Sequence, residues 1–277
     1  MVTVNERSAD EFVEWIKLWN EKSGDLLVIT PNAYEQKINH LKSFKVVEKT
    51  QVQNEDNIFK ILLKPSSNQK FDSGDILAIY PSQKENVERL YSISKLNNHI
   101  QLIVKLHKNG LGSNYLYNLQ ARDIIKAKVI DNQSFHLPKD ANRIIMIANG
   151  TGIAPFFGMI ESNINGKIID LYLGVKYDNS TSRDYRQFAD TSIKKNKLQK
   201  LHIAFSREGQ KLYVTDLISR DSQYFAEALE NGTIIMICGS LNMQKDVEEI
   251  LDDICLKINR KPLQYYISRN QTLSDCY

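Results

Sequence analysis

The chain has few cysteines, and it lacks both a long apolar run and an N-terminal signal pattern. Its three cysteines, at positions 238, 255 and 276, form no CxxC pair and have no histidine close enough in sequence to suggest a metal motif. Structural disulfides and a metal site are therefore not expected. No apolar run approaches the roughly 18 residues that a membrane span needs, and the first ten residues lack a basic-then-apolar pattern. These absences predict a cytoplasmic protein without a membrane span.

A strong charge of either sign is also absent. The net charge is +3, no basic stripe stands out, and the lysines at 194–197 fit the polar end of a helix. A nucleic-acid partner is therefore not expected. The 277 residues, 42% of them hydrophobic and 25% charged, fit a globular protein with room for two domains.

The first 42 residues are predicted to form a helical extension. Residues 8–11, Ser-Ala-Asp-Glu, have the form of a capping box, and Phe12, Trp15, Ile16 and Trp19 then recur at helical spacing until Gly24. This pattern predicts an amphipathic helix with an aromatic stripe. Packing on its own domain is the simpler role for the stripe, and docking a partner is the alternative.

Residues 43–138 are predicted to form an antiparallel β-barrel. Short β-type runs are separated by turn residues such as those at 54–57 and 73–75. Five or six antiparallel strands favour a small barrel. The predicted strands include residues 46–47, 58–63, 76–80, 90–94 and 100–106.

Two segments of this barrel carry groups that suit a flavin dinucleotide. The Arg89 guanidinium suits a diphosphate, the Tyr91 ring suits stacking on a flat heterocycle, and the Ser92 hydroxyl can reach a ring nitrogen. Downstream, residues 110–113 read Gly-Leu-Gly-Ser at an apparent helix start, where backbone N–H groups and the Ser113 hydroxyl form an anion site. The alternative for Arg89 to Ser92 is an ordinary edge strand.

Residues 139–277 are predicted to form a doubly wound α/β domain. The unbroken apolar run at 144–148 is typical of a parallel strand buried on both faces, and helical patterns alternate with further such strands. Ligands bind beyond the carboxyl ends of these strands. The residues at those ends are Gly150 to Gly152, Gly174, Ser206 with Arg207, and Cys238 with Gly239.

Taken in order, the motifs resemble those of the ferredoxin–NADP reductase family, which includes the reductase modules of sulfite reductase flavoproteins and diflavin reductases. They are RLYS (89–92), GLGSNYL (110–116), NGTGIAPF (149–156), LGVKY (173–177), FSREGQKLYV (205–214) and CGSLNMQKDV (238–247), with a terminal aromatic. The resemblance covers residues 44–277. It implies FAD and NADPH as cofactors, with a barrel binding FAD and the α/β domain binding NADP.

The resemblance also implies roles for individual residues. The catalytic set is Ser92 at flavin N5, Cys238 near the nicotinamide, Asp275 and the terminal Tyr277. The implied FAD contacts are Arg89, Leu90, Tyr91, Ser92, His107, Gly110, Leu111, Gly112, Ser113 and Tyr277. The implied NADP contacts are Gly150, Thr151, Gly152, Cys238 and Gly239, with Ser206, Arg207, Lys211 and Tyr213 around the 2′-phosphate. Two cations and two hydroxyls independently suit such a dianion.

The chain departs from the family pattern at several positions, among them His107, which stands about where a tyrosine often stacks on the FAD adenine. Asn149 replaces a proline before GTG, Phe157 replaces an arginine after APF, and Ser240 replaces the acid that follows CG in diflavin enzymes. The stretch from Pro81 to Glu88 also leaves no room for the connecting domain of diflavin enzymes.

The implied activity is hydride transfer from NADPH to FAD, followed by single-electron transfer to a separate carrier: a ferredoxin, a flavodoxin or an FMN-domain protein. One alternative is the reductase module of a sulfite reductase or other diflavin system, cut from a longer polypeptide. A flavin-binding interaction module without catalysis is the other alternative.

Overall fold

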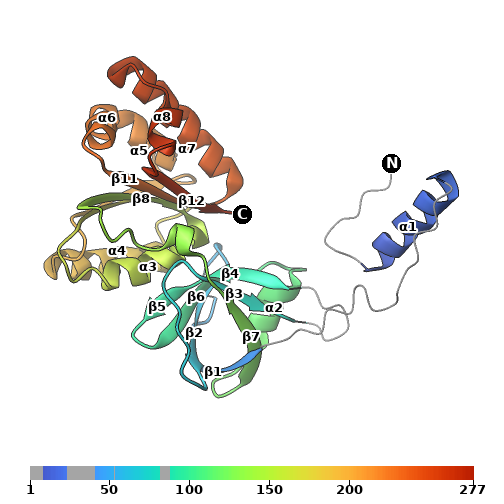
Figure 1. The fold of residues 1–277 in the computed structure, drawn as a ribbon. Coiled ribbons are helices and arrows are strands. Elements are labelled where there is room, and N and C mark those ends of the chain that lie inside the picture. Colours follow the sequence, from blue (N-terminus) through green and yellow to red (C-terminus); the bar gives the residue numbers. More distant parts are fainter. Residues whose placement is uncertain (1–8, 24–40, 53, 82–87) are drawn as a thin grey trace.

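The computed structural model describes residues 9–23, 41–52, 54–81 and 88–277. Two sheets dominate it, an antiparallel one from the first half of the chain and a parallel one from the second half. They form two bodies in Figure 1, with the antiparallel sheet in blue and green and the parallel sheet flanked by helices in yellow to red. The C-terminus lies where the two bodies meet.

The antiparallel sheet confirms the predicted barrel and contains seven strands, in the order β4-β3-β7-β1-β2-β6-β5. Along β2, buried side chains alternate with partly exposed ones, and the buried Phe59, Ile61 and Leu63 belong to the common interior of the barrel. The strands are β1 (Lys42–Lys49), β2 (Ile58–Pro65), β3 (Ile76–Ile79), β4 (Arg89–Ser92), β5 (Ser94–Leu96), β6 (His99–Lys105) and β7 (Ile124–Ile130).

One extended run of chain closes this barrel. Strands β4 and β5 lie at opposite ends of the strand order, yet only Ile93 separates them in sequence. Strand β4 pairs with β3 and β5 pairs with β6, so residues 89–96 join both edges. The backbone of Ile93 accepts a hydrogen bond from the Gly74 N–H and donates one to the Asp75 carbonyl, which fixes the junction. The RLYS segment is therefore held at the closure of the barrel.

The second sheet is fully parallel, as predicted, with the order β10-β9-β8-β11-β12. The central strand β8 is buried along residues 144–148, which explains its unbroken apolar sequence. The strands are β8 (Arg143–Asn149), β9 (Ile168–Val175), β10 (Lys200–Phe205), β11 (Ile234–Gly239) and β12 (Thr272–Cys276).

Helices cover both faces of the parallel sheet, as Figure 1 shows. Helices α3 (Ala154–Glu161) and α4 (Ser180–Lys194) contribute to the core on the face toward the barrel. The opposite core contains side chains of α5 (Val214–Arg220), α6 (Ser222–Glu230), α7 (Leu241–Ile254) and α8 (Leu263–Ile267). The chain between α7 and α8 includes a π-helical turn, Cys255–Asn259.

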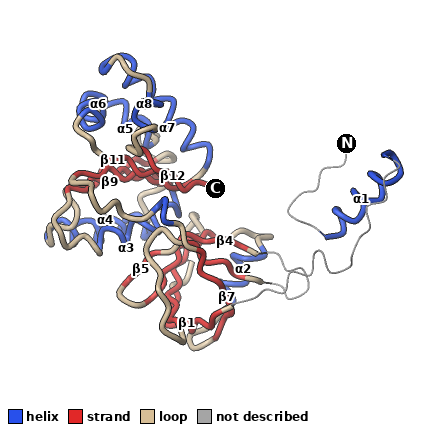
Figure 2. The backbone as a smooth tube through the Cα atoms, viewed as in Figure 1, coloured by secondary structure: helices blue, strands red, loops and turns tan. Residues whose placement is uncertain are grey.

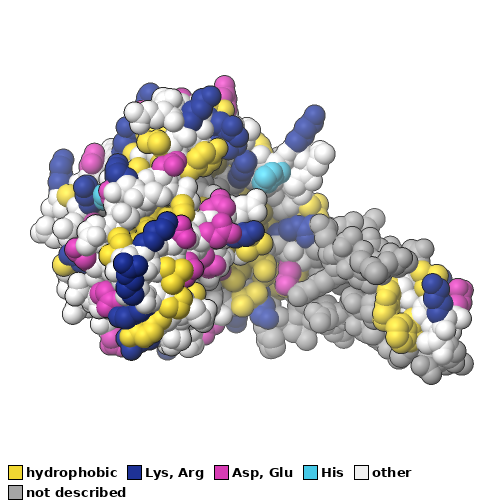
Figure 3. All heavy atoms as spheres, turned by 90° about the horizontal axis from the view of Figure 1, so that it is seen from above, with side chains coloured by type: hydrophobic (Ala, Val, Ile, Leu, Met, Phe, Trp, Pro, Cys, Tyr) yellow, Lys and Arg dark blue, Asp and Glu magenta, His cyan; other side chains and the backbone are white. Residues whose placement is uncertain are grey.

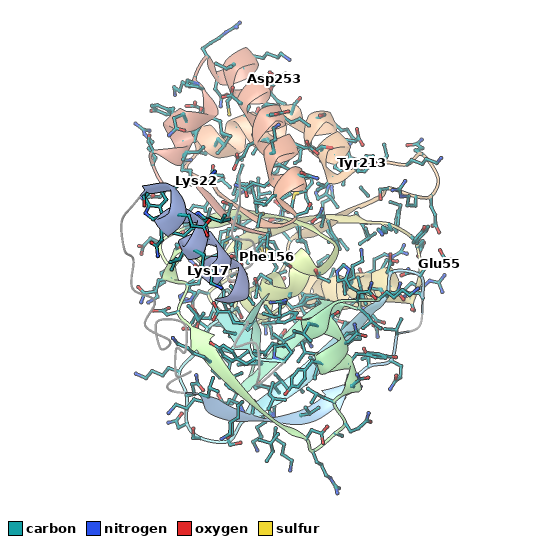
Figure 4. The ribbon with its side chains drawn as sticks, turned by 90° about the vertical axis from the view of Figure 1, so that its right-hand side faces the viewer. Lys17, Lys22, Glu55, Phe156, Tyr213 and Asp253 are labelled. Carbon is teal, nitrogen blue, oxygen red and sulfur yellow. The ribbon has the colours of Figure 1, made fainter. Side chains whose placement is uncertain are left out.

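The two bodies touch closely through α3 and β5. A Cβ added at Gly158 of α3 would lie 2.1 Å from the Ser73 hydroxyl oxygen and 2.6 Å from the Lys95 backbone nitrogen. Only a glycine lets the helix approach the strand this closely. In Figure 4, Phe156 of the same helix lies between the two sheets.

The predicted N-terminal helix is present as α1 (Ala9–Ser23). Trp15 and Trp19 stack with their ring centroids 5.5 Å apart. Figure 2 shows this helix away from both sheets. Residues 1–8, 24–40 and the side chains of 9–14 lie outside the described part, so the role of the aromatic stripe stays a prediction.

Other features agree with the composition. All three cysteines are free thiols. None of the described helices is both long and apolar enough to cross a bilayer. On the face seen in Figure 3, dark blue and magenta side chains are interspersed, so that face carries no continuous stripe of one charge.

Candidate active site

Two adjoining cavities lie where the barrel meets the parallel sheet. The smaller, of about 250 Å³, is lined mainly by barrel residues. The larger, of about 610 Å³, is lined mainly by the loops that follow the parallel strands. Four residues line both cavities: Lys105, His107, Thr151 and Tyr277.

The smaller cavity gathers the predicted flavin-binding residues of the barrel. Strand β4 and the start of α2 (Leu111–Asn118) approach each other across it. A Cβ added at Gly112 would lie 2.6 Å from the Tyr91 hydroxyl and 2.8 Å from Arg89 Cγ, so this contact requires a glycine. The lining residues from the predicted set are Arg89, Leu90, Tyr91, Ser92, His107, Gly110, Leu111, Gly112, Ser113 and Tyr277.

The start of α2 has the properties of an anion site. No side chain caps this helix end, and its first turn holds no acidic residue. Its free N–H groups and the helix dipole therefore add to the positive charge of Arg89, which lines the same cavity. The Ser113 hydroxyl accepts from the His107 N–H and donates to the Gly110 carbonyl. In this structure the Ser113 hydroxyl therefore stabilises the loop from His107 to Gly110, and the backbone N–H groups of the helix start are the donors left for an anion.

These residues fit FAD in three respects. The close glycine contact shapes the cradle, Arg89 and the helix start suit a diphosphate, and the Tyr91 ring lines a cavity suited to a flat heterocycle. Burial raises the pKa of Tyr91 to about 12, so its hydroxyl stays neutral at physiological pH.

A hydrogen bond joins the barrel to the last strand of the parallel sheet beside this cavity. The Ser92 hydroxyl donates to Asp275 Oδ2 at 2.7 Å. Asp275 lies on β12, opposite Cys238 of β11. Burial raises the pKa of Asp275, and the Ser92 hydrogen bond opposes this shift. The structure thus brings together three of the four predicted catalytic residues around one strand pair.

Cys238 itself is fully buried and lines neither cavity. It lies under the glycine turn, because a Cβ added at Gly152 would be 2.2 Å from the Cys238 carbonyl oxygen. Burial raises the thiol pKa well above its usual value, so the thiol stays protonated. Cys238 therefore lies beneath the lining of the larger cavity, and its predicted role near the nicotinamide stays a prediction.

Most of the predicted NADP-binding residues line the larger cavity. They are Gly150, Thr151, Ser206, Arg207, Tyr213 and Gly239. Lys211 lies on the same loop as Arg207 but outside the lining, and Gly152 lies beneath it. In Figure 4, Tyr213 and the barrel residue Glu55 lie on the same side of the molecule.

Two lysines of the larger cavity were missed from the sequence. Lys105 ends β6, Lys176 follows β9, and both line the cavity between barrel and sheet. Burial, and next the nearby charge of Lys176, lowers the pKa of Lys105. Two adjacent cations favour an anion between them. Lys176 had a readable signal, since it directly follows a parallel strand at its carboxyl end.

Tyr277 stands between the two cavities. Its N–H donates to the Gly239 carbonyl at 3.0 Å, and its hydroxyl lies 3.4 Å from Thr151 Oγ1. The residue keeps 63% of its surface exposed, although the surrounding protein raises the pKa of its phenol to about 12. The terminal residue is therefore anchored, with its ring where the two cavities meet.

Phe157, which replaces a family arginine, belongs to the interface between the two bodies. Its ring packs edge to face against Tyr185 and Phe188, and the Lys60 ammonium of β2 lies 5.7 Å from its centroid. The side chain is 4% exposed. The substitution therefore serves packing between the barrel and α4.

Comparison with known proteins identifies both halves of the chain. Residues 43–129 match the family model of the oxidoreductase FAD-binding domain, and residues 146–249 match that of the oxidoreductase NAD-binding domain. The fold is similar to a ferredoxin-NADP+ reductase from Plasmodium falciparum, with a TM-score of 0.70 and 23% identity over 87% of this chain and 97% of that one.

Curated relatives share the sequence over part of their length. The sulfite reductase [NADPH] flavoprotein alpha-component of Buchnera aphidicola is 33% identical over an alignment of 196 residues, which covers 60% of this chain and 31% of the relative. The nitric oxide synthase of Anopheles stephensi is 31% identical over 207 residues, 64% of this chain and 16% of the relative. This chain thus spans about a third or less of these relatives.

The two matched regions follow each other along the chain: the first spans the antiparallel sheet, and the second spans most of the parallel sheet but ends before β12. They bind FAD and a nicotinamide dinucleotide. The chain therefore belongs to the ferredoxin–NADP reductase family of oxidoreductases, which joins an FAD-binding barrel to an NAD(P)-binding α/β domain.

Proposed function

We propose that this chain oxidises NADPH with FAD and passes the electrons singly to a separate carrier protein, a ferredoxin, a flavodoxin or an FMN-domain protein. The observation that carries the proposal is the Ser92–Asp275 hydrogen bond, which joins the two domains beside the meeting point of the two cavities. Bound FAD would supply the redox chemistry, taking a hydride at N5 and releasing electrons one at a time.

The residues of the smaller cavity would bind and orient the flavin. Arg89 and the backbone at the start of α2 would hold the diphosphate, and Tyr91 would stack on the flavin. Ser92 would donate to a ring nitrogen, with Asp275 as its alternative partner when the nitrogen is not engaged. Catalysis by the protein is then mostly positioning, because stacked rings at contact distance are what hydride transfer needs.

The residues of the larger cavity would select NADPH. Ser206, Arg207 and Tyr213 line its wall beyond β10, with Lys211 on the same loop, and they offer two cations and two hydroxyls to a 2′-phosphate. Lys105 and Lys176 would add positive charge for the remaining phosphates. NADH carries a bare 2′-hydroxyl and so has no phosphate for these side chains to bind.

Anaerobic titration of the FAD-loaded protein tests the proposal. NADPH should bleach the flavin absorbance with NADH far less effective, and the reduced protein should then reduce a one-electron acceptor such as ferricyanide. A screen of ferredoxin, flavodoxin and FMN-domain proteins would identify the carrier. A yellow protein that NADPH does not bleach would instead support the non-catalytic flavin-binding module.

A sulfite reductase or other diflavin system is the second candidate. The sequence similarity to the Buchnera aphidicola flavoprotein component favours it. In that case an FMN-domain protein should accept electrons at a higher rate than ferredoxin or flavodoxin in the same screen.

A further inference from the structure

Asn149, one of the departures from the family pattern, ties two loops of the larger cavity together. It ends β8, and its carboxamide reaches the residue that follows β11. Asn149 Oδ1 accepts the Ser240 N–H at 3.0 Å, and Asn149 Nδ2 donates to Ser240 Oγ at 3.1 Å. A backbone N–H can only donate, so this pairing fixes which end of the carboxamide is oxygen.

The second partner of Ser240 determines where its hydroxyl hydrogen points. Ser240 caps α7, and its Oγ accepts the Met243 N–H at 3.3 Å. Two N–H donors therefore occupy the two lone pairs of this oxygen. Its own hydrogen is left over, and no acceptor among the described residues takes it. Because Ser240 lines the larger cavity, this hydrogen is available to a ligand there.

The surrounding backbone is shaped to keep the pair in place. Gly239 has φ of +153°, and a Cβ added to it would lie 2.1 Å from Asn149 Oδ1. Its carbonyl accepts the N–H of Tyr277. The carboxamide of Asn149 thus fits against the same loop that anchors the terminal residue, and a larger side chain at 239 would expel it.

The strand order places this pair away from the predicted 2′-phosphate site. Ser206 and Arg207 follow β10 at one edge of the sheet. Asn149 and Ser240 follow the central strands β8 and β11, beside β12 with Asp275. Neighbouring strands are about 4.8 Å apart, so Asn149 lies about two strand spacings from the group after β10 and Ser240 about three.

We infer that Ser240 donates its hydroxyl hydrogen to an oxygen on the nicotinamide half of NADP(H), and that Asn149 is the positioning residue that directs it there. The inference rests on the proposed function, because it deepens the same site. A proline at 149 has no carboxamide, so the proline expected there from the family pattern could not make this pair. An acid at 240 would present acceptors to the ligand, whereas Ser240 presents a donor.

Two ligands separate this role from general support of the cavity. NADP⁺ contains the nicotinamide half, and 2′-phospho-AMP lacks it but keeps the 2′-phosphate. Calorimetric titration of the FAD-loaded protein with each ligand gives both dissociation constants. Retained flavin absorbance confirms that each variant is folded.

The variants change the hydroxyl in different ways. Ser240→Ala removes it, and Ser240→Thr keeps both the hydroxyl and the helix cap. Asn149→Asp keeps the size of the side chain and still accepts the Ser240 N–H, but its second oxygen takes the hydroxyl hydrogen away from the cavity. Asn242→Asp places the same charge in the wall of the same cavity without touching the pair, and it serves as the charge control.

We expect Ser240→Ala and Asn149→Asp to weaken NADP⁺ binding by about three- to tenfold, the value of one hydrogen bond, with 2′-phospho-AMP binding unchanged. Ser240→Thr should bind NADP⁺ as the wild type does, and Asn242→Asp should weaken it less than Asn149→Asp. Equal weakening of both ligands, or no change in either, would overturn the inference while leaving the proposed function intact. A wild type that binds neither ligand would overturn both.

Discussion

Ser92 and Asp275 are 183 residues apart in sequence, and the 2.7 Å hydrogen bond between them joins the closing strand of the barrel to the edge strand of the parallel sheet. The Ser92 hydroxyl therefore contacts both domains, and Ser92 also lines the cavity where the flavin is expected. The bond also holds the half-buried carboxyl of Asp275 next to the smaller cavity. Its partner in this bond is the neutral hydroxyl of Ser92 and not a cation.

Replacing Ser92 tests whether its hydroxyl takes part in flavin reduction. Ser92→Ala should retain FAD, because Arg89 and the start of α2 supply the affinity, but it should slow flavin reduction by NADPH by roughly one to two decades. Stopped-flow absorbance measures the rate. Ser94→Ala is the matched control, since Ser94 is fully buried and its hydroxyl has no hydrogen-bond partner in the described structure. Reduction of Ser92→Ala at the wild-type rate would leave Ser92 with a structural role alone.

The raised pKa of Asp275 predicts a pH-dependent cost in stability. A carboxyl whose pKa is higher in the folded than in the unfolded state binds its proton more tightly when folded. The free energy of unfolding therefore falls as pH rises from the unfolded pKa to the folded pKa, and the cost is complete above the folded pKa. Asp275→Asn should raise the melting temperature at pH 7, with the gain shrinking toward pH 4. A gain that stays constant with pH would contradict this assignment.

Arg207 is expected to read the 2′-phosphate. Arg207→Ala should raise the KM for NADPH by the loss of one charge-assisted contact, about 1.5–3 kcal/mol, and leave the KM for NADH little changed. Steady-state kinetics with both nucleotides measure the split. Arg183→Ala removes another exposed arginine, which lies outside both cavities, and should alter neither constant. Parallel losses with NADPH and NADH would show that Arg207 does not recognise the phosphate.

The glycine at 112 is expected to be essential for FAD. Gly112→Ala would place a methyl group within 2.9 Å of Arg89 and Tyr91, so the start of α2 must move away from β4. The fraction of protein that purifies with FAD should fall sharply, as absorbance near the flavin maximum would show. Gly174→Ala meets its nearest atoms at 3.5 Å, an ordinary contact, and should keep full FAD content. Normal FAD content in Gly112→Ala would mean that the cradle lies elsewhere.

Much of the fold could be predicted because burial on one or both faces leaves a clear pattern. The run at 144–148 is apolar throughout since it is buried on both faces, and β2 alternates since one face lines the barrel core. Strand β12 escaped prediction because Thr272–Cys276 is a half-exposed edge strand in which three of the five residues are polar. Strand β7 was not predicted either. It begins with Ile124, an apolar residue that is 63% exposed, so its sequence does not show a regular alternation of apolar and polar residues.

The site residues also fall into those that the sequence predicted and those that it did not. Glycine turns and the RLYS segment are local signals, so the sequence places them without knowledge of the fold. The Asn149–Ser240 pair spans 91 residues, and the meeting of Lys105 with Lys176 depends on how the barrel packs against the sheet. Such pairs have no spacing rule. Asn149 and Ser240 were visible only as departures from a pattern, and their complementarity required the geometry.

The terminal tyrosine is expected to compete with the nicotinamide. Its ring stands where the two cavities meet, held by the bond from its N–H to Gly239 and by contact with Thr151. A ring in that position must be displaced before nicotinamide and flavin can stack. Stacking beyond simple burial contributes about 0.5–1.5 kcal/mol, which NADPH can offset with its 2′-phosphate contacts and NADH cannot.

Tyr277→Ser should therefore tighten NADP⁺ binding by about two- to tenfold, strengthen the charge-transfer absorbance between nicotinamide and flavin, and narrow the preference for NADPH. Titration of the FAD-loaded variant with NADP⁺ measures the first two effects, and kinetics with both nucleotides measure the third. Tyr277→Phe keeps the ring and loses only the contact with Thr151, so it should behave much like the wild type. If Tyr277→Ser gave wild-type affinity and spectra, the terminal ring would not cover the flavin. The nicotinamide would then reach the flavin past Thr151 without displacing a ring.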